Sequence, residues 1–205
     1  MSFSRFMRGA GRDLIETAIL ALLIFFAVRS AVQNFKVEGF SMDPSLENGE
    51  YILVDKVSYG VFDLGPLERF IPFVDSGDDG FLFEGPQRGD VIVFEAPIAE
   101  GRDFIKRVIG VPGDQIEVRD GVVYVNGQAI DEPYITHKGS YDWPADGSGP
   151  ATVPDKHYFV LGDNRDNSSD SHIWGFLPAD KVVGRAWVSY WPTSSIGLAP
   201  HHAIP

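Results

Sequence analysis

Residues 115–127 read Gln-Ile-Glu-Val-Arg-Asp-Gly-Val-Val-Tyr-Val-Asn-Gly, and this run indicates the fold class most directly. Asp120-Gly121 is flanked by two runs in which apolar and polar residues alternate, a pattern typical of strands with one buried face. A type I′ hairpin turn needs positive φ at both central residues, and Asp-Gly adopts that conformation readily. Asn126-Gly127 provides a second turn signal. The run therefore predicts an antiparallel hairpin.

Similar short runs lie on both sides of this hairpin. They are rich in β-branched and aromatic residues and are separated by Gly, Pro and Asp, which is the usual signature of strands. They occupy residues 51–55, 91–95, 104–109, 158–161 and 182–191. The sequence shows no internal repeat and no long amphipathic helix after residue 35. We therefore expect a mainly β protein with antiparallel sheets.

The N-terminal region has a different character. An apolar stretch, residues 14–32, follows Arg5, Arg8 and Arg12. A helix over residues 14–33 would be about 30 Å long at roughly 1.5 Å per residue, which matches the hydrocarbon core of a bilayer. We therefore expect an uncleaved transmembrane anchor, with the arginine-rich end in the cytoplasm and the rest of the chain outside.

Two alternatives compete with the anchor. A cleaved secretory signal also has a basic start and an apolar core, but only a cut after Ser30 satisfies its preference for small residues. A buried core helix is disfavoured because the stretch is apolar on all faces.

Composition excludes several classes of function. The net charge is −12 at pH 7, so a nucleic-acid partner is not expected. The chain has no cysteine, which excludes disulfides, thiolate zinc sites and a cysteine nucleophile. His201 and His202 lack a third ligand at metal-site spacing, and the acidic loop 163–170 lacks the glycine and glutamate of an EF-hand. We expect no metal and no cofactor.

Nucleophilic catalysis without cysteine favours serine, which needs a base. The chain has no Gly-x-Ser-x-Gly elbow, so a Ser-His-Asp triad would require an unfamiliar arrangement. Four segments point to another chemistry. They are residues 39–46 (Gly-Phe-Ser-Met-Asp-Pro-Ser-Leu), 88–94 (Arg-Gly-Asp-Val-Ile-Val-Phe), 104–114 (Phe-Ile-Lys-Arg-Val-Ile-Gly-Val-Pro-Gly-Asp) and 162–171 (Gly-Asp-Asn-Arg-Asp-Asn-Ser-Ser-Asp-Ser).

In this order, directly after a membrane anchor, the four segments resemble the characteristic boxes of type I signal peptidases. The resemblance runs from the anchor to about residue 180, with gaps at the insertions 61–84 and 131–154. It implies that Ser41 is the nucleophile and Lys106 the general base, a variant of the serine triad. It also implies that Ser168 orients the lysine amine and that an ion-paired loop braces the site, with the residues Asp163, Arg165, Asp170 and Arg107.

The resemblance further implies two antiparallel β-sheet subdomains, and signal peptides of exported preproteins as substrates, cleaved after small residues. Separately from the resemblance, we expect a monomer. The chain departs from the family pattern in two places. Gly39 stands where some members have a serine that donates to the oxyanion, so another donor is needed. The acidic loop continues as Asp170-Ser171-His172, where members often have arginine in the last place.

The resulting expectation is a single-pass serine endopeptidase of a bacterial inner membrane. Its parts are a cytoplasmic segment 1–13, the anchor 14–33, an extracytoplasmic catalytic domain 34–195 and a frayed tail 196–205. Within the domain we expect a core of residues 34–114 and 156–195 and a small inserted subdomain at about 115–155. The alternatives are a dedicated Ser-Lys maturation protease of a conjugation or secretion system, or an inactive membrane-tethered β scaffold.

Overall fold

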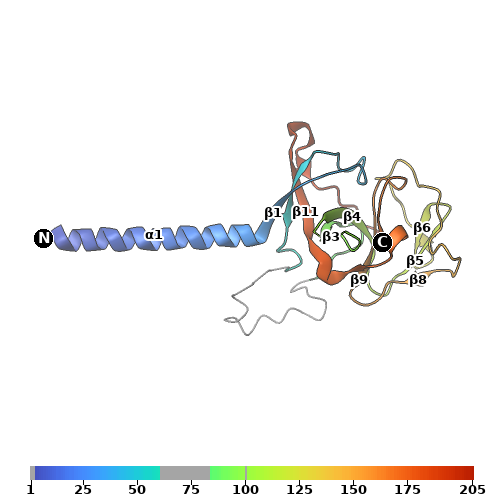
Figure 1. Cartoon of the computed structure of the whole chain (residues 1–205), viewed down its shortest axis with the longest axis horizontal. Helices are drawn as coiled ribbons and strands as arrows, with labels where there is room; N and C mark the ends of the chain where they lie inside the picture. Colours follow the sequence, from blue (N-terminus) through green and yellow to red (C-terminus); the bar gives the residue numbers. More distant parts are fainter. Residues whose placement is uncertain (1–2, 61–83, 100) are drawn as a thin grey trace.

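The computed structural model describes residues 3–60, 84–99 and 101–205. A single long helix, α1 (Phe3–Ala31), extends from one end of a body built mainly of antiparallel β-strands (Figure 1). The predicted mainly β fold with an N-terminal apolar helix is therefore confirmed. The apolar clusters at residues 70–73 and 81–83, interpreted as core or as a membrane-facing surface, lie outside the described residues.

The helix α1 contains a stretch suited to a bilayer. Residues Asp13–Ala31 have a mean hydropathy of 2.0, and none of this stretch is buried in the body of the protein. The helix ends at Ala31, two residues before the expected boundary, because Val32 and Gln33 already pair with Asp55 and Val54 as part of a strand. The exposed apolar surface fits a membrane-anchored protein.

The larger sheet has eight strands within the described residues, in the order β1-β2-β11-β3-β4-β9-β10, with β12 paired to β11. The neighbouring strands of this sheet pair in antiparallel fashion. The strands are β1 (Val32–Lys36), β2 (Tyr51–Asp55), β3 (Val91–Glu95), β4 (Asp103–Gly110), β9 (His157–Leu161), β10 (Leu177–Pro178), β11 (Val182–Trp191) and β12 (Gly197–Leu198). The short helix α2 (Ser171–Trp174) and the 3₁₀ turns η2 (Ala179–Lys181) and η3 (Thr193–Ser195) connect them.

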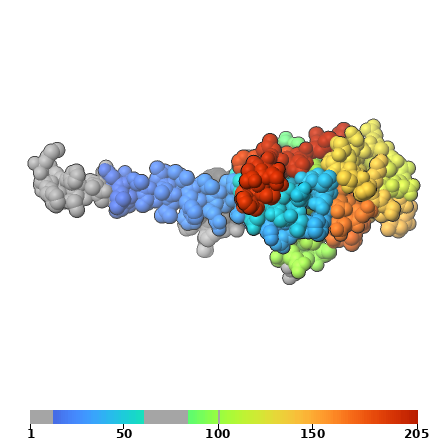
Figure 2. Space-filling view, turned by 90° about the horizontal axis from the view of Figure 1, so that it is seen from above, coloured from blue at the N-terminus to red at the C-terminus, as the bar shows by residue number. Residues whose placement is uncertain are grey.

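The smaller sheet has the order β7-β6-β5-β8 and comes from residues expected to form the inserted subdomain. Its strands are β5 (Gln115–Arg119), β6 (Val122–Val125), β7 (Gln128–Ala129) and β8 (Ala151–Thr152). Asp120 and Gly121 have φ of 48° and 72°, as the predicted type I′ turn requires. This sheet lies at the end of the body opposite α1 (Figures 1 and 2).

Apolar clusters hold these parts together. One cluster packs Ile109 and Phe159 of the larger sheet against Ile116 and Val123 of the smaller sheet, so the two sheets share a core. A second cluster lies under β1, β2 and the loop between them, and includes Met42 and Leu46 at 1% and 2% exposure. Burial of side chains of this size contributes roughly 1.5–3 kcal/mol each, so the loop that carries Ser41 is firmly attached.

The closing residues are ordered against the body, so the expectation of a frayed tail is wrong. Gly197 and Leu198 pair with β11, and Ala199 and Ile204 are buried in two of the core clusters. His201 bonds to the backbone of Val91. The segment is ordered because its few apolar side chains pack into the core clusters of the sheets. This packing depends on the tertiary fold, so the spacing of residues in the sequence does not predict it.

Candidate active site

Ser41 lies in the loop between β1 and β2, and contacts from outside the loop set its position. Asn164 donates its backbone N–H to Ser41 O at 3.0 Å and its side-chain Nδ2–H to Phe40 O at 3.0 Å. At the start of the loop, Gly39 has φ of 98°, a region that favours glycine, and donates its N–H to Asn48 Oδ1 at 2.9 Å. The N–H of Gly39 is therefore already engaged.

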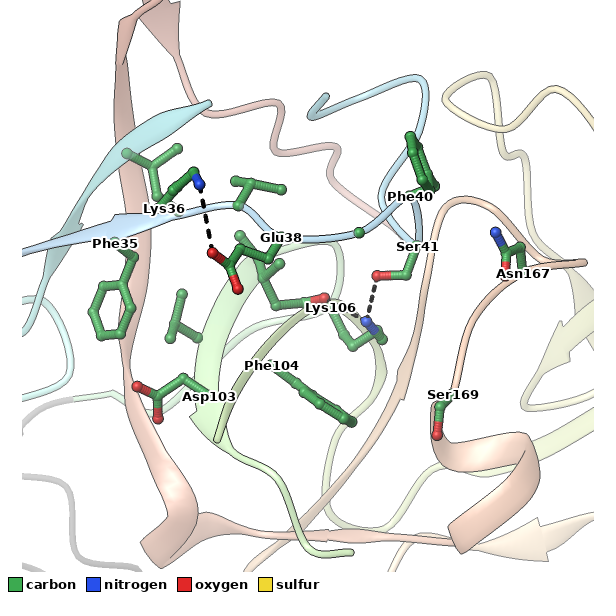
Figure 3. A pocket seen from close by; sticks show the side chains of 15 residues that line it. Phe35, Lys36, Glu38, Phe40, Ser41, Asp103, Phe104, Lys106, Asn167 and Ser169 are labelled. Atoms are coloured by element: carbon green, nitrogen blue, oxygen red, sulfur yellow. Dashed lines mark hydrogen bonds and ion pairs between the residues drawn. The ribbon is translucent and has the colours of Figure 1, made fainter. Parts of the chain in front are cut away.

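Lys106 comes from β4, where it stands opposite Ile92 of β3. Its Nζ lies 2.6 Å from Ser41 Oγ and 2.8 Å from Ile105 O, although Ser41 and Lys106 are 65 positions apart in the chain (Figure 3). Lys106 is only 3% exposed. The fold therefore brings together the two residues that the sequence selected as the reactive pair, within hydrogen-bond distance.

Burial changes the acid–base behaviour of Lys106. Desolvation lowers the pKa of its ammonium from 10.5 to about 8, while the carboxylates of Asp170 and Asp163 partly oppose this shift. The Phe104 ring, 5.4 Å from Nζ, is one of the groups that exclude water. At a pKa of about 8, roughly one lysine in ten is neutral at pH 7, compared with about one in 2,500 for an unperturbed lysine.

Ser168 lies in the loop between β9 and α2, close to Ser41. A methyl group built on Gly162 would meet Ser168 Oγ at 2.2 Å and Ser41 O at 2.5 Å, so Gly162 allows the two chain segments to approach. Ser168 Oγ is buried and has no hydrogen-bond partner within the described part of the chain. The second polar contact of the lysine amine is Ile105 O, and the orienting role expected of Ser168 stays a prediction.

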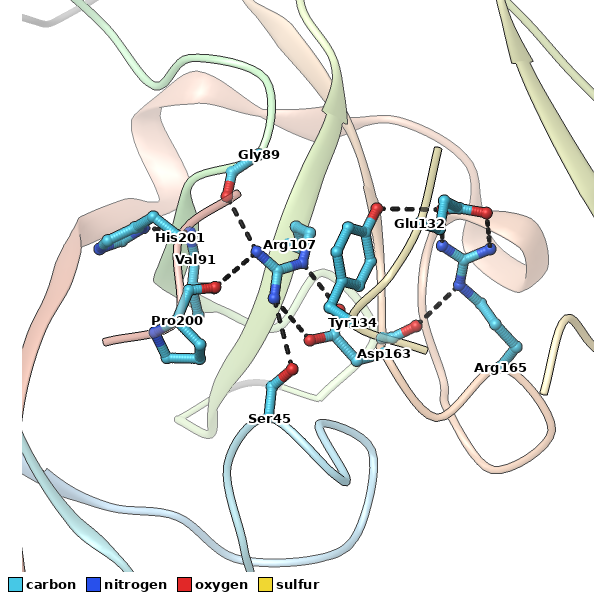
Figure 4. A network of polar contacts seen from close by, with 11 residues as sticks. Ser45, Gly89, Val91, Arg107, Glu132, Tyr134, Asp163, Arg165, Pro200 and His201 are labelled. Atoms are coloured by element: carbon cyan, nitrogen blue, oxygen red, sulfur yellow. Dashed lines mark hydrogen bonds and ion pairs between the residues drawn. The ribbon is translucent and has the colours of Figure 1, made fainter. Parts of the chain in front are cut away.

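Arg107 and Asp163 form a buried ion pair on the other side of β4 (Figure 4). Arg107 Nη2 donates to Asp163 Oδ2 at 2.6 Å and Nε to Oδ1 at 2.9 Å, with both side chains at most 1% exposed. The guanidinium also stacks over the Tyr134 ring at 4.0 Å. This bidentate pair connects β4, which carries Lys106, to the loop that begins at Asp163.

Arg165 has a partner that the sequence did not suggest. It pairs with Glu132, which is 33 positions away in the Pro- and Gly-rich stretch after β7, and its Nε donates to Gly162 O at 3.0 Å. Asp170 is fully buried and accepts the Gly162 N–H at 2.9 Å. His172 Nδ1 lies 2.6 Å from Asp170 Oδ1, so histidine occupies the position next to this aspartate.

Ser41 and Lys106 both line a cleft of about 460 Å³ (Figure 3). Apolar side chains from the four strands β1, β2, β3 and β4 line much of it, together with charged side chains. The lining includes Phe35, Val37, Ile52, Val93, Phe104 and Ile105, together with Lys36, Glu38 and Asp103. An apolar cleft beside a nucleophile and a base is suited to binding an extended peptide. No group of three or more His, Asp or Glu side chains in the described ranges is placed to hold a metal ion.

Comparisons with known proteins show the family of this chain. The family described as "Signal peptidase, peptidase S26" matches residues 11–191. A probable signal peptidase I-2 of Synechocystis sp. is 36% identical over 192 residues, covering 91% of this chain and 76% of that protein. Signal peptidase I of Bacillus caldolyticus is 38% identical over 187 residues, covering 87% of each chain.

Among solved structures, a signal peptidase I from Enterococcus faecalis V583 is 35% identical and covers 50% of this chain and 97% of its own, with a TM-score of 0.43. The match to the family covers most of the chain, including every residue selected for the reactive site. The chain therefore belongs to the signal peptidase family, peptidase S26.

Proposed function

We propose that this protein is a membrane-bound serine endopeptidase that removes N-terminal signal peptides from exported preproteins, with Ser41 as nucleophile and Lys106 as general base. The observation that carries the proposal is the 2.6 Å contact between a buried lysine amine and Ser41 Oγ in an apolar cleft that both residues line. The relatives named signal peptidases support the substrate class.

In the proposed mechanism, neutral Lys106 Nζ accepts the hydroxyl proton of Ser41 as Oγ attacks the carbonyl carbon of the scissile bond. The resulting ammonium gives this proton to the nitrogen of the leaving peptide, and an acyl-enzyme remains. Lys106 then accepts a proton from the water that attacks the ester, and returns this proton to Ser41 Oγ as the ester bond breaks and the signal peptide leaves. Ile105 O accepts a hydrogen bond from the amine and so helps to direct it towards Ser41.

The oxyanion that forms during attack needs hydrogen-bond donors, each worth roughly 3–4 kcal/mol in other proteases. In the proposed site the backbone N–H of Ser41 is one donor. Gly39 has no hydroxyl, and its N–H bonds to Asn48 Oδ1. An ordered water or another backbone N–H therefore has to act as the second donor.

The cleft supports a preference for small residues before the cleavage site. The apolar side chains of Ile52, Val93 and Ile105 line the same cleft as Ser41 and Lys106. In the proposal, a peptide extends along the cleft and places small side chains against these apolar side chains.

The proposed topology has the N-terminus in the cytoplasm and Ser41 outside, near the bilayer. Nine residues separate Ser41 from the end of α1 at Ala31, and part of this segment is the strand β1. Protease added to right-side-out spheroplasts should digest the body of the protein. Full protection of the body under these conditions would contradict this orientation.

The decisive experiment compares the purified wild-type protein with Ser41→Ala in detergent micelles that contain a preprotein. The proposal predicts cleavage at the signal-peptide boundary by the wild type and none by the variant. A panel of preproteins then separates a general signal peptidase, which cleaves many of them, from a dedicated maturation protease, which cleaves one. A Ser41→Ala protein that cleaves at the wild-type rate would refute the assignment of the nucleophile.

A further inference from the structure

The strands β3 and β11 diverge at Arg185. Before this point β11 pairs with β3, with Val182 opposite Phe94 and Arg185 opposite Ile92. From Arg185 onward β11 pairs with β2 instead. The ladder between β3 and β11 therefore ends there, and backbone groups at its end need other hydrogen-bond partners.

The imidazole of His201 supplies these partners. Its Nδ1 accepts the N–H of Val91 on β3 at 3.1 Å, and its Nε2–H donates to Ala186 O on β11 at 2.8 Å. A neutral histidine with its proton on Nε2 is the only form that makes both bonds. The side chain thus joins the two strands where their own ladder ends (Figure 4 shows His201 beside Val91).

The residues around His201 belong to a segment that we define as the strap, residues 197–204. At its start, Gly197 pairs with Ser189 of β11, and near its end Ile204 is 7% exposed within the core that contains Ile109 of β4. Between these points, the N–H of His202 donates to Gly89 O at 3.2 Å. The strap is therefore attached at both ends and in the middle.

The strap also contacts the ion pair behind the reactive lysine. Arg107 Nη1 donates to Pro200 O at 2.7 Å and to Gly89 O at 3.0 Å, so one carbonyl of the strap helps to satisfy this buried guanidinium (Figure 4). Arg107 follows Lys106 on β4, and its partner Asp163 precedes Asn164, whose N–H bonds to Ser41 O. Contacts thus run without a break from the strap to both members of the Ser41–Lys106 pair.

We propose that His201 is a positioning residue for the active site: it closes the gap between β3 and β11, holds the strap on Arg107, and thereby keeps Lys106 aligned with Ser41. The family match ends at residue 191, so the strap lies outside the matched residues. The proposal rests on the proposed function only for its activity measurements, because its structural part concerns strand contacts alone.

The charges around His201 favour its neutral form. Arg185 of β11 and Arg107 of β4 face the ring, while Asp90, before β3, lies 3.6 Å from Nδ1 and opposes them. Burial, followed by Arg185, lowers the pKa of His201 below 6.5. A histidine with a lowered folded pKa contributes stability above its unfolded pKa, and this contribution is lost as pH falls through the folded value. Acid therefore weakens the attachment of the strap.

Three variants test the proposal. His201→Leu removes both hydrogen bonds, whereas His201→Gln offers one acceptor and one donor on a side chain that does not titrate. His137→Leu makes the same change at an exposed histidine outside the strap and is the matched control. The measurements are kcat and KM for preprotein cleavage, thermal stability against pH, and hydrogen exchange at the Val91 amide, the last two in proteins that also carry Ser41→Ala.

We expect His201→Leu to lower kcat by about 10- to 100-fold at little change in KM, because the reactive pair is misaligned while the cleft is intact. Exchange at Val91 should become faster. His201→Gln should recover most of the kcat and the Val91 protection, and should lose less stability than the wild type as pH falls below about 6.5. His137→Leu should match the wild type throughout.

The proposal is overturned if His201→Leu keeps the wild-type kcat, or if its loss of activity only follows the fraction of unfolded protein. It is also overturned if the Val91 amide keeps its protection in His201→Leu. Because exchange and stability are measured in an inactive background, they decide the role of the strap even if the wild type fails to cleave preproteins, a result that would refute the proposed function instead.

Discussion

Replacement of Gly162 by alanine tests how the loop after β9 positions Ser41. The added Cβ would lie 2.2 Å from Ser168 Oγ and 2.5 Å from Ser41 O, whereas ordinary contacts begin at 3.4 Å. Rotation of the Ser168 hydroxyl would still leave the Ser168 Cβ 2.6 Å from the added Cβ, and Ser41 O belongs to the backbone and accepts the N–H of Asn164. Either the loop or the backbone at Ser41 must therefore move by about 1 Å.

A displacement of this size has a large effect on reactivity because Ser41 Oγ and Lys106 Nζ are only 2.6 Å apart. Misplacement by about 1 Å costs on the order of 100-fold in rate. Overpacking at a buried site also destabilises a protein by about 1–3 kcal/mol. We therefore expect Gly162→Ala to lower kcat/KM by about 100-fold while most of the protein stays folded.

The assay is kcat/KM for preprotein cleavage, together with denaturant unfolding of the same samples. Gly197→Ala is the matched control, because an added Cβ there has no neighbour within 4 Å and the φ of Gly197 lies outside the left-handed region. The reasoning is refuted if Gly162→Ala cleaves as fast as this control, since Gly162 would then have no role in the approach of the loop to Ser41.

Three further predictions concern the same site. Gly39→Ala should lower kcat/KM and stability, because a residue with a side chain pays about 1–3 kcal/mol to adopt the φ of 98° found at Gly39. Gly39→Ser should be more active than Gly39→Ala if the serine hydroxyl reaches the oxyanion, and equal rates for the two variants would exclude that contact. Asp163→Ala should lose about 3–5 kcal/mol of unfolding free energy, because it leaves the Arg107 charge buried without its partner, and a loss below about 1 kcal/mol in urea unfolding would contradict this. The unfolding free energy of the wild type should rise relative to that of Lys106→Met between about pH 8 and 10.4, because in this range the lysine is protonated in the unfolded state and neutral in the folded state. If the two plots of unfolding free energy against pH are parallel, the pKa of Lys106 is not lowered.

Local sequence signals predicted the parts of the fold that depend on local chemistry. The turn at Asp120-Gly121 follows from the tolerance of these residues for positive φ, and the structure confirms it. The strand β1 was not predicted, because Val32–Lys36 directly continues an apolar helix and becomes a strand only through pairing with β2. Long-range pairing of this kind leaves no spacing pattern in the sequence.

The same distinction applies to the site. Ser41 and Lys106 were selected from motif resemblance, but the desolvation of Lys106 depends on groups from other elements. The pair formed by Glu132 and Arg165 joins residues from two separate loops, so no spacing rule could reveal it. The strap was missed for a related reason, since His201 acquires its role only when the sheet curls and leaves β3 and β11 apart.

The measurement that tests the central claim most directly is kcat/KM for preprotein cleavage by the wild type as a function of pH, with Lys106→Arg in parallel. The lowered pKa of Lys106 predicts that kcat/KM rises with pH through an apparent pKa of about 8, because only the neutral amine accepts the proton of Ser41. Lys106→Arg should be inactive at every pH, because guanidinium stays protonated. A Lys106→Arg protein with near-normal kcat/KM would show that Lys106 is not the base.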